Sequence, residues 1–306
     1  MNSTQASVAN AAIVSTSHSR LAPPRTHSML ERLAAIALCA AVTAPAAVAA
    51  PPDAATGIDS KMTLCLNDPE HASTGGQDEC ITDAGRAWDA QLNTTYRALQ
   101  ASLPAADRPA LLRAQRAWLA RRDADLKLIG AVYATARGTV YAPMNANDVM
   151  ELTRQRALTL LRFESDRAAH GFSLTARLPR PADDKPERVA TVPQRGARFE
   201  RAHCAALAGL DAIGRCAAQA TPLYRQDIDD VTKAIEHRLP RASREAMRTS
   251  SLKWQAFVAA QPPLIGALYP AAATSGVPPQ IAIEMRDEAA ARLQQLVYAE
   301  DKIGAD

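Results

Sequence analysis

The chain has 306 residues with a formal net charge of +3, and only 4% of its residues are aromatic. This length allows two domains of ordinary size, and the low aromatic content with abundant alanine favours packed helices over a sheet. Without residues 1–49, which carry three arginines and one glutamate, the chain is close to neutral. This balance argues against nucleic acid or a membrane surface as partner.

Residues 1–49 are predicted to be a leader that contains a secretory signal peptide. Glu31-Arg32 precede a short apolar run that ends in Ala47-Val48-Ala49, which is typical of a signal sequence cleaved near Ala49. The translation start is either Met1 or Met29. Because the apolar run is too short to span a bilayer, we expect a periplasmic or secreted protein with no transmembrane segment in the mature chain.

Four cysteines follow the leader, and an even number in an exported protein suggests disulfides. They allow three connectivities, of which we favour Cys65 with Cys80 and Cys204 with Cys216. These pairs close short loops, and each would stabilise the fold by about 3 kcal/mol. No histidine near them has the spacing of a zinc ligand, so no metal site is predicted.

The segment 62–166 is expected to form three antiparallel helices. An apolar stripe with steps of three and four residues runs through the first helix and ends at Pro104. Asp107 is expected to cap the second helix and Asp148 the third. The short connection at Pro104 implies that the first two helices are antiparallel neighbours. The stripe of the first helix comprises Ile81, Ala84, Trp88, Leu92, Tyr96, Leu99 and Leu103.

The same chemistry returns at an interval of 136 residues along the chain. Cys80 corresponds to Cys216, Trp118 to Trp254, and Arg156 to Arg292. We therefore predict a second, diverged copy of the helical domain at 199–302, with Ser243 in the place of Asp107, an antiparallel connection at Pro240, and a first short helix over 199–210. The proline-rich, basic residues 167–198 are expected to be a linker. The fold class is thus all-α, with two tandem three-helix modules joined by this linker.

The first copy contains a series of residues in a characteristic order. It has Cys80, then Asp89-Ala-Gln-Leu92-Asn93 and Tyr96. Ala114-Gln115 before Trp118, Arg122-Asp123 after it, and Thr153 with Arg156 complete the pattern. This order of residues resembles the N-terminal domain of the LprI-type lysozyme inhibitors. The resemblance covers about Cys65 to Phe163 and implies an exported helical domain, in some members an inhibitor of lysozyme.

One departure from the family pattern concerns the contact between the second and third helices. Relatives commonly carry two further cysteines at the positions that Leu126 and Asp148 occupy here. Their joint replacement is what the loss of one disulfide between those helices would produce. We therefore expect the loop between these helices, and any binding surface on it, to lack the disulfide that relatives have there.

The candidate binding residues are Asn93, Tyr96, Gln115, Arg121, Arg122 and Asp123. A polar cluster tying two helices together is the preferred interpretation of Asn93, Gln115 and Asp123. The alternative is that Arg121 or Arg122 reaches the catalytic carboxylates of a lysozyme. Because the same helix carries Asp123 and Asp125, a solvated face of mixed charge is the more common outcome for those arginines. Trp118 and Trp254 are expected in the core.

No catalytic or cofactor motif was found in the sequence. GxSxG, HExxH, P-loop and dinucleotide glycine patterns are missing, and the six histidines are scattered. We therefore expect a non-enzymatic protein without cofactor. The leading hypothesis is a protein-binding module of the lysozyme-inhibitor kind, with lysozyme or another envelope protein as partner. The alternative is a non-inhibitory envelope scaffold or a peptidoglycan-associated interaction domain.

Overall fold

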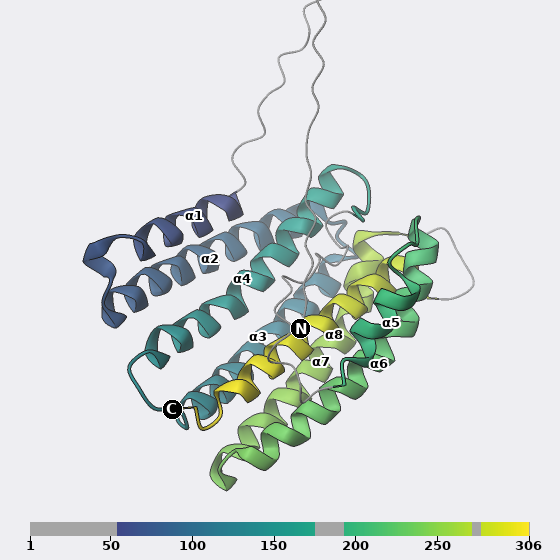
Figure 1. The fold of residues 1–306 in the computed structure, drawn as a ribbon. Helices are drawn as coiled ribbons and strands as arrows, with labels where there is room; N and C mark the ends of the chain where they lie inside the picture. Colours follow the sequence, from purple (N-terminus) through teal and green to yellow (C-terminus); the bar gives the residue numbers. More distant parts are fainter. Residues whose placement is uncertain (1–53, 175–192, 271–276, 306) are drawn as a thin grey trace, which may run out of the picture. The chain divides into compact units, whose positions relative to one another are not determined.

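The computed structural model describes residues 54–174, 193–270 and 277–305, and this part of the chain is helical without a β-strand (Figure 1). The predicted leader 1–49 and most of the predicted linker lie outside the described residues. The all-α prediction is confirmed. The α-helices are α1 (Ala54–Leu66), α2 (Thr74–Ser102), α3 (Arg108–Tyr133), α4 (Tyr141–Ala168), α5 (Arg195–His203), α6 (Leu210–Arg238), α7 (Arg244–Leu268) and α8 (Pro279–Lys302).

Helix α2 begins with a side-chain cap and buries the predicted stripe. The Oγ of Ser73 accepts a hydrogen bond from the backbone N–H of Gly76 at 3.0 Å, which satisfies one of the free amides of the first turn. All stripe residues are buried except Tyr96, which is partly exposed. The stripe therefore faces the core, as the apolar spacing predicts.

The starts of α3 and α7 agree with the expected positions, although the expected hydrogen bonds do not form. Asp107 and Ser243 each occupy the position before the helix, and neither side chain accepts a capping hydrogen bond. Pro109 lies in the first turn of α3, where a missing N–H costs nothing. Position and proline thus mark the start of α3 without a side-chain cap.

The expectation that Asp148 caps the third helix is wrong. Helix α4 begins at Tyr141, so Asp148 lies inside it and accepts a hydrogen bond from the hydroxyl of Tyr133 at 2.8 Å. This bond ties α3 to α4 near the position where relatives are expected to carry a disulfide. The early start became possible because Pro143 falls in the first turn, where proline is tolerated.

The short helix before Cys204 is also displaced from its predicted place. It was expected over 199–210, but α5 runs from Arg195 to His203, and Cys204 is its C-terminal cap. Two ion pairs hold its start, because Nη1 of Arg195 lies 2.8 Å from carboxylate oxygens of both Asp227 and Asp230 on α6. These acidic partners hold a helix start that lies four residues before the predicted one.

The main helix pairs are α2 with α4, α6 with α8, and α3 with α7 (Figure 1). Antiparallel packing across Pro104 was expected to make α2 and α3 neighbours, and across Pro240 to make α6 and α7 neighbours. Instead, α3 and α7, which are the middle helices of the two halves, pack mainly against each other. A single cluster of buried side chains runs through both halves, from Trp88 and Trp118 to Trp254 and Leu296. Both tryptophans expected in the core are there.

The helix bounds of the two halves recur at one interval. Each bound of α6 lies 136 residues after the corresponding bound of α2, and α7 begins 136 residues after α3. An internal repeat remains a prediction, with which these bounds agree. The two halves do not form separate cores, so the picture of two independently packed modules is not confirmed.

Both predicted disulfides are present. Cys65 is bonded to Cys80, with Cα atoms 5.7 Å apart, and Cys204 to Cys216, with Cα atoms 5.9 Å apart. The first joins α1 to α2, and the second joins the end of α5 to α6. Each disulfide therefore attaches a short helix to a long one.

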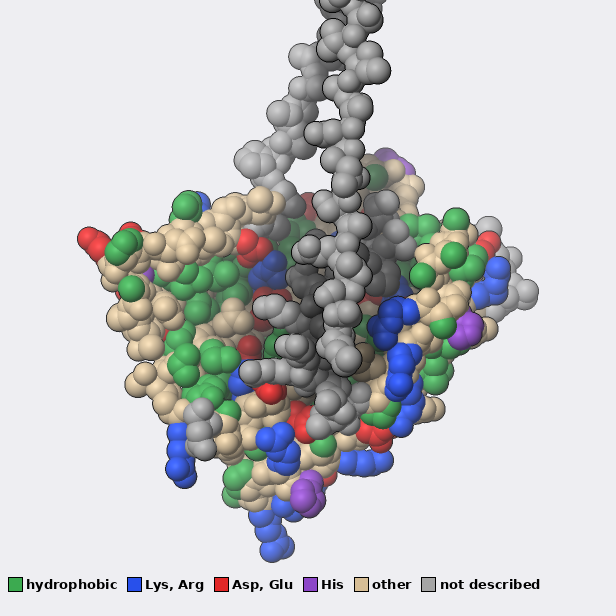
Figure 2. Space-filling model, in the orientation of Figure 1, with side chains coloured by type: hydrophobic (Ala, Val, Ile, Leu, Met, Phe, Trp, Pro, Cys, Tyr) green, Lys and Arg blue, Asp and Glu red, His purple; other side chains and the backbone are tan. Residues whose placement is uncertain are grey.

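Among the described helices, none combines the length and apolar character needed to cross a bilayer. In Figure 2, basic and acidic side chains are interspersed over the face that is drawn. Both signs of charge are therefore present on the visible part of this face.

Candidate functional site

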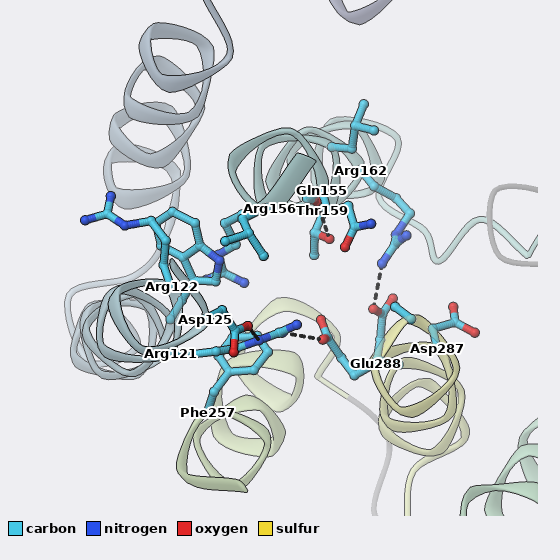
Figure 3. A pocket seen from close by; sticks show the side chains of 15 residues that line it. Arg121, Arg122, Asp125, Gln155, Arg156, Thr159, Arg162, Phe257, Asp287 and Glu288 are labelled. Atoms are coloured by element: carbon cyan, nitrogen blue, oxygen red, sulfur yellow. Dashed lines mark hydrogen bonds and ion pairs between the residues drawn. The ribbon is translucent and has the colours of Figure 1, made fainter. Parts of the chain in front are cut away.

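A cavity of about 220 Å³ lies between helices of both halves (Figure 3). Its wall combines two aromatic rings, Trp118 from α3 and Phe257 from α7, with many charged groups. Such a mixture of apolar surface and converging polar groups is typical of a ligand site. The charged residues in the wall are Arg121, Arg122, Asp125, Arg156, Arg162, Glu284, Asp287 and Glu288.

Arg121 crosses from α3 to α8 at the cavity wall. Its Nη1 lies 3.3 Å from Glu288, its Nε lies 3.3 Å from Asp125, and its guanidinium lies 4.9 Å from the ring centroid of Phe257. Only 8% of the residue is exposed. The side chain is therefore fully engaged inside the protein (Figure 3).

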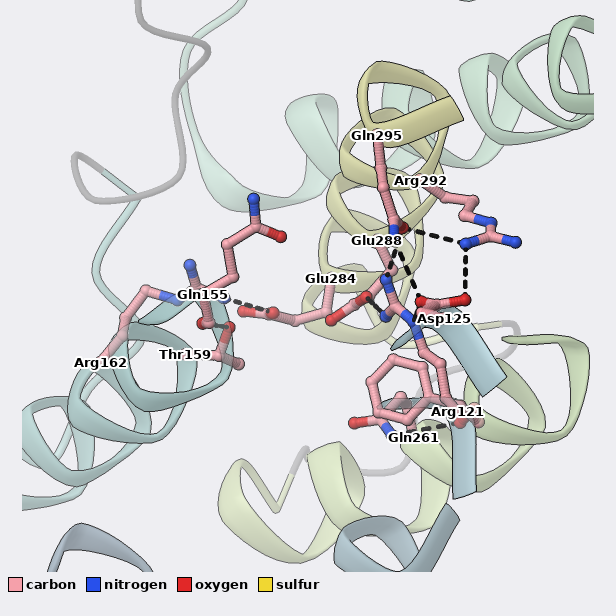
Figure 4. A network of polar contacts seen from close by, with 11 residues as sticks. Arg121, Asp125, Gln155, Thr159, Arg162, Gln261, Glu284, Glu288, Arg292 and Gln295 are labelled. Atoms are coloured by element: carbon pink, nitrogen blue, oxygen red, sulfur yellow. Dashed lines mark hydrogen bonds and ion pairs between the residues drawn. The ribbon is translucent and has the colours of Figure 1, made fainter. Parts of the chain in front are cut away.

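Asp125 is the centre of the polar network drawn in Figure 4. Its Oδ1 accepts from Nη1 of Arg292 at 3.1 Å and from the hydroxyl of Ser250, and its Oδ2 accepts from Gln295 at 3.2 Å. Burial opposes its ionisation, but the charges of Arg292 and Arg121 hold its pKa below the usual value. The ionised carboxylate thus joins α3, α7 and α8.

Arg156 from α4 contrasts with this network. Its Nε donates to Oε1 of Gln115 at 3.1 Å, and only 3% of the residue is exposed. Among the described residues, neither Nη1 nor Nη2 has a hydrogen-bond partner. Burial lowers the pKa of Arg156 to about 10, so the group is still a cation at neutral pH.

Helix α8 contributes three carboxylates to the cavity wall, those of Glu284, Asp287 and Glu288. Arg162 from α4 donates to Glu284 on α8 at 2.7 Å (Figure 4). Burial raises the pKa of the neighbouring Asp287 to about 6, although the charge of Arg286 works against this. Glu284 and Glu288 are four residues apart, and Asp287 falls between them, so one face of α8 supplies all three carboxylates.

The structure separates the predicted site residues. Gln115 ties α3 to α4 through Arg156, as the helix-linking interpretation predicts. Asn93 and Asp123 are exposed and bond only within their own helices, Asn93 to Asp89 and Asp123 to Arg122. For these two residues the helix-linking interpretation is wrong, because their side chains point away from a neighbouring helix. Tyr96 is partly buried against the core.

The two arginines of the lysozyme hypothesis also differ. Arg121 is buried and paired, so the expected solvated face is wrong for it and for Asp125. Arg122 has a side chain that is 29% exposed, pairs with Asp123 at 2.8 Å, and lies 5.4 Å from the ring centroid of Trp118. Of these two arginines, Arg122 is therefore the one that a protein partner can reach.

Sequence reasoning missed the residues from α8 and the role of Arg156. The carboxylates of α8 carry a usable signal, because their i, i+3 and i+4 spacing places them on one side of a helix. Arg156 stood in the family pattern but was not selected. Its burial depends on α7, which lies a hundred residues further along the chain.

One cluster with metal-binding residue types adjoins the first disulfide. Donor atoms of Cys65, His71 and Cys80 lie within 4.8 Å of one another. The two sulfurs are bonded to each other, so they are not thiolates. The oxidised protein therefore offers only His71 as a ligand in this cluster.

Comparison with known proteins identifies the first half. Residues 65–160 match the model of the family described as "Lysozyme inhibitor LprI". This segment is an LprI-type domain. It contains α2, α3 and most of α4, together with Cys65 and the disulfide to Cys80.

Two relatives extend the comparison. An uncharacterized protein of Rhizobium meliloti is 37% identical over 95 residues, which are 26% of this chain and 66% of that protein. The chain thus spans just under two thirds of that relative. A crystal structure of an uncharacterized protein from Burkholderia thailandensis is similar with a TM-score of 0.56 and 25% identity, covering 83% of this chain and 98% of that one. The structural similarity therefore extends well beyond the LprI-type domain.

Proposed function

We propose that this protein is an exported helical module of the lysozyme-inhibitor kind, which binds a lysozyme and protects the cell wall from it. The observation that carries the proposal is the LprI-type domain at residues 65–160. The scarcity of catalytic motifs in the sequence supports a binding role over an enzymatic one. The second half, including α7 and α8, completes the core on which this domain packs.

An exported location is part of the proposal. Two disulfides support it, because disulfides persist in oxidising compartments such as the periplasm and the cell exterior. The predicted cleavage near Ala49 would release a chain that starts close to residue 50.

For the contact with lysozyme we propose Arg122, together with the neighbouring Asp123. Arg122 is held over the face of Trp118 and remains partly exposed, so its guanidinium is oriented before a partner arrives. A lysozyme uses two carboxylates for glycoside hydrolysis, and a guanidinium can bind a carboxylate through two parallel hydrogen bonds. Arg121 is excluded from this role because its donors are already bound to Asp125 and Glu288.

The test is a turbidity assay of lysozyme on whole cell-wall substrate with the oxidised protein of residues 50–306. We expect dose-dependent inhibition that Arg122→Ala weakens at least tenfold, which corresponds to about 1.4 kcal/mol of binding free energy. Arg116→Ala is the matched control, because Arg116 is an exposed arginine on the same helix. Circular dichroism would verify that both variants keep their helices.

A non-inhibitory envelope scaffold is the second candidate. The near-neutral charge of the chain without residues 1–49 favours it, because a partner of a strongly cationic lysozyme is usually acidic. No inhibition at large molar excess, with both disulfides verified by mass spectrometry, would rule out the inhibitor for that enzyme. Sedimentation with purified cell-wall sacculi that persists at high salt would then support the scaffold.

A further inference from the structure

Two buried arginines at comparable positions have very different surroundings. Arg156 on α4 and Arg292 on α8 are 3% and 0% exposed. Arg292 donates to Asp125 at 3.1 Å, to Ser250 at 2.6 Å and to Gln295 at 2.9 Å. Arg156 donates only to Gln115, and its two Nη atoms have no partner among the described residues.

The sequence explains why Arg156 lacks these acceptors. At the interval of 136 residues that relates the two arginines, Asp125 corresponds to Gln261 and Ser250 corresponds to Ala114. A carboxylate is thus replaced by a neutral amide, and a hydroxyl by a methyl group. The amide nitrogen of Gln261 donates to the backbone oxygen of Phe257 in its own helix. Among the described residues, no carboxylate takes beside Arg156 the place that Asp125 fills beside Arg292.

A buried cation without an anionic partner is unfavourable, because burial removes its hydration and nothing replaces it. The carboxylate of Glu288 contributes to the electrostatic surroundings of Arg156 but forms its ion pair with Arg121. The ring of Phe257, 5.7 Å from the guanidinium carbon, gives a weaker cation–π contact. In the part of the chain that the structure describes, Arg156 therefore lacks an anionic hydrogen-bond partner of its own.

The cavity that Arg156 lines has room for a small molecule. Its volume of about 220 Å³ corresponds to several water molecules at roughly 30 Å³ each. Trp118 and Phe257 supply apolar surface, and Arg156 belongs to the wall with two buried Nη atoms that have no hydrogen-bond partner among the described residues. We propose that this cavity binds a small monocarboxylic organic acid, whose carboxylate accepts hydrogen bonds from the Nη atoms of Arg156 as Asp125 does from Arg292.

The surroundings favour a carboxylate over a phosphate. A guanidinium presents parallel N–H groups that match the two oxygens of a carboxylate. Glu284, Asp287 and Glu288 line the same cavity, so a dianion would meet stronger repulsion than a monoanion. Arg122 also lines this cavity, but the present proposal rests on Arg156 and does not depend on inhibition of a lysozyme.

The experiment is a thermal unfolding series of residues 50–306 at pH 7 in sodium acetate, with sodium chloride at the same ionic strength as reference. A ligand that binds only the folded state raises the Tm with its concentration. We expect acetate to raise the Tm of the wild type above the chloride reference, and to give Arg156→Met no such rise. Inorganic phosphate at equal ionic strength also raises the Tm by exclusion from the protein surface, so only the part of the rise that Arg156→Met abolishes is compared, and this part should be smaller for phosphate than for acetate.

Two further variants complete the design. Arg116→Met changes an exposed arginine outside the cavity wall and should retain the full acetate effect. Arg156→Lys keeps the charge but loses the parallel donors, so its acetate effect should be reduced, and it serves if Arg156→Met does not fold. An equal rise in wild type and in either Arg156 variant would overturn the proposal. A larger Arg156-dependent rise with phosphate than with acetate would overturn the assignment to carboxylates.

Discussion

Asp125 on α3 and Arg292 on α8 form an ion pair in which neither side chain is exposed to solvent, with Oδ1 and Nη1 3.1 Å apart. The two residues are 167 positions apart in the sequence, so the pair joins the first half of the chain to the last helix. Removing one partner would leave the other as an uncompensated buried charge.

Asp125→Ala should therefore lower the free energy of unfolding by about 3–5 kcal/mol. Urea unfolding followed by circular dichroism measures this change. Asp123→Ala is the matched control, because Asp123 is exposed on the same helix and should change the value by less than about 0.5 kcal/mol. The double variant Asp125→Leu with Arg292→Met should lose less free energy of unfolding than Asp125→Ala, because it leaves no unpaired buried charge. An equal or larger loss in the double variant would contradict this account.

Gly196→Ala should destabilise the packing of α5 on α6. A Cβ at Gly196 would lie 2.5 Å from the Cγ of Tyr224, which is closer than such contacts occur. The ring cannot easily move, because the Tyr224 hydroxyl donates to Glu200 at 2.5 Å. We expect a loss of about 1–3 kcal/mol in urea unfolding. Gly130→Ala in α3, where the new Cβ meets nothing within 4 Å, should instead gain up to about 1 kcal/mol.

Replacing both Cys204 and Cys216 by serine should lower the free energy of unfolding by about 3 kcal/mol. The disulfide closes a loop with a sequence separation of 12, and in the chain-entropy account it restricts the unfolded chain. Urea unfolding of the variant, compared with the wild type in oxidised form, measures the loss. Adding reductant to the variant should lower its free energy of unfolding further, by the contribution of the remaining disulfide Cys65–Cys80. If the oxidised variant is as stable as the wild type, the disulfide Cys204–Cys216 does not stabilise the fold.

Asp287→Asn should change how stability depends on pH. Asp287 faces Arg286, Glu284 and Arg162, and burial raises its pKa to about 6. The folded state therefore keeps a proton that the unfolded state, with a pKa near 4, releases between about pH 4 and pH 6, so the wild type loses stability as the pH rises through this window.

The amide of the variant does not titrate. The free energy of unfolding of the variant, relative to that of the wild type, should therefore increase by about 1–2 kcal/mol from pH 4 to pH 7. This figure is lower than the full linkage value because the Asp287 side chain is 27% exposed. Thermal or urea unfolding across that range measures the difference. A difference that stays constant with pH would contradict the raised pKa.

The helices were predictable from the sequence because their apolar residues recur with helical spacing. The stripe from Ile81 to Leu103 and the core tryptophans required only local periodicity. The pairing of α3 with α7 was not predictable in this way. Leu128 and Ile129 are equally apolar whether they face α2 or α7, so periodicity cannot select the neighbouring helix.

The candidate site was harder to predict than the fold, because its partners are distant in sequence. Locally, Arg121 and Asp125 look like an exposed pair four residues apart. Their burial is caused by Glu288 and Arg292, which α8 supplies from the other end of the chain. The disulfides were predictable because each joins cysteines that are close in sequence, and so their pairing did not depend on the tertiary fold.

The packing of α3 on α7 has a consequence for shorter proteins of this kind. A polypeptide made of residues 65–160 alone would contain α3 but not the helix that covers it. Its uncovered apolar side would be satisfied by the same side of a second molecule, so we expect such a polypeptide to form dimers whose stability depends on concentration. In the present chain the covering helix belongs to the same molecule, and the contact forms at any dilution.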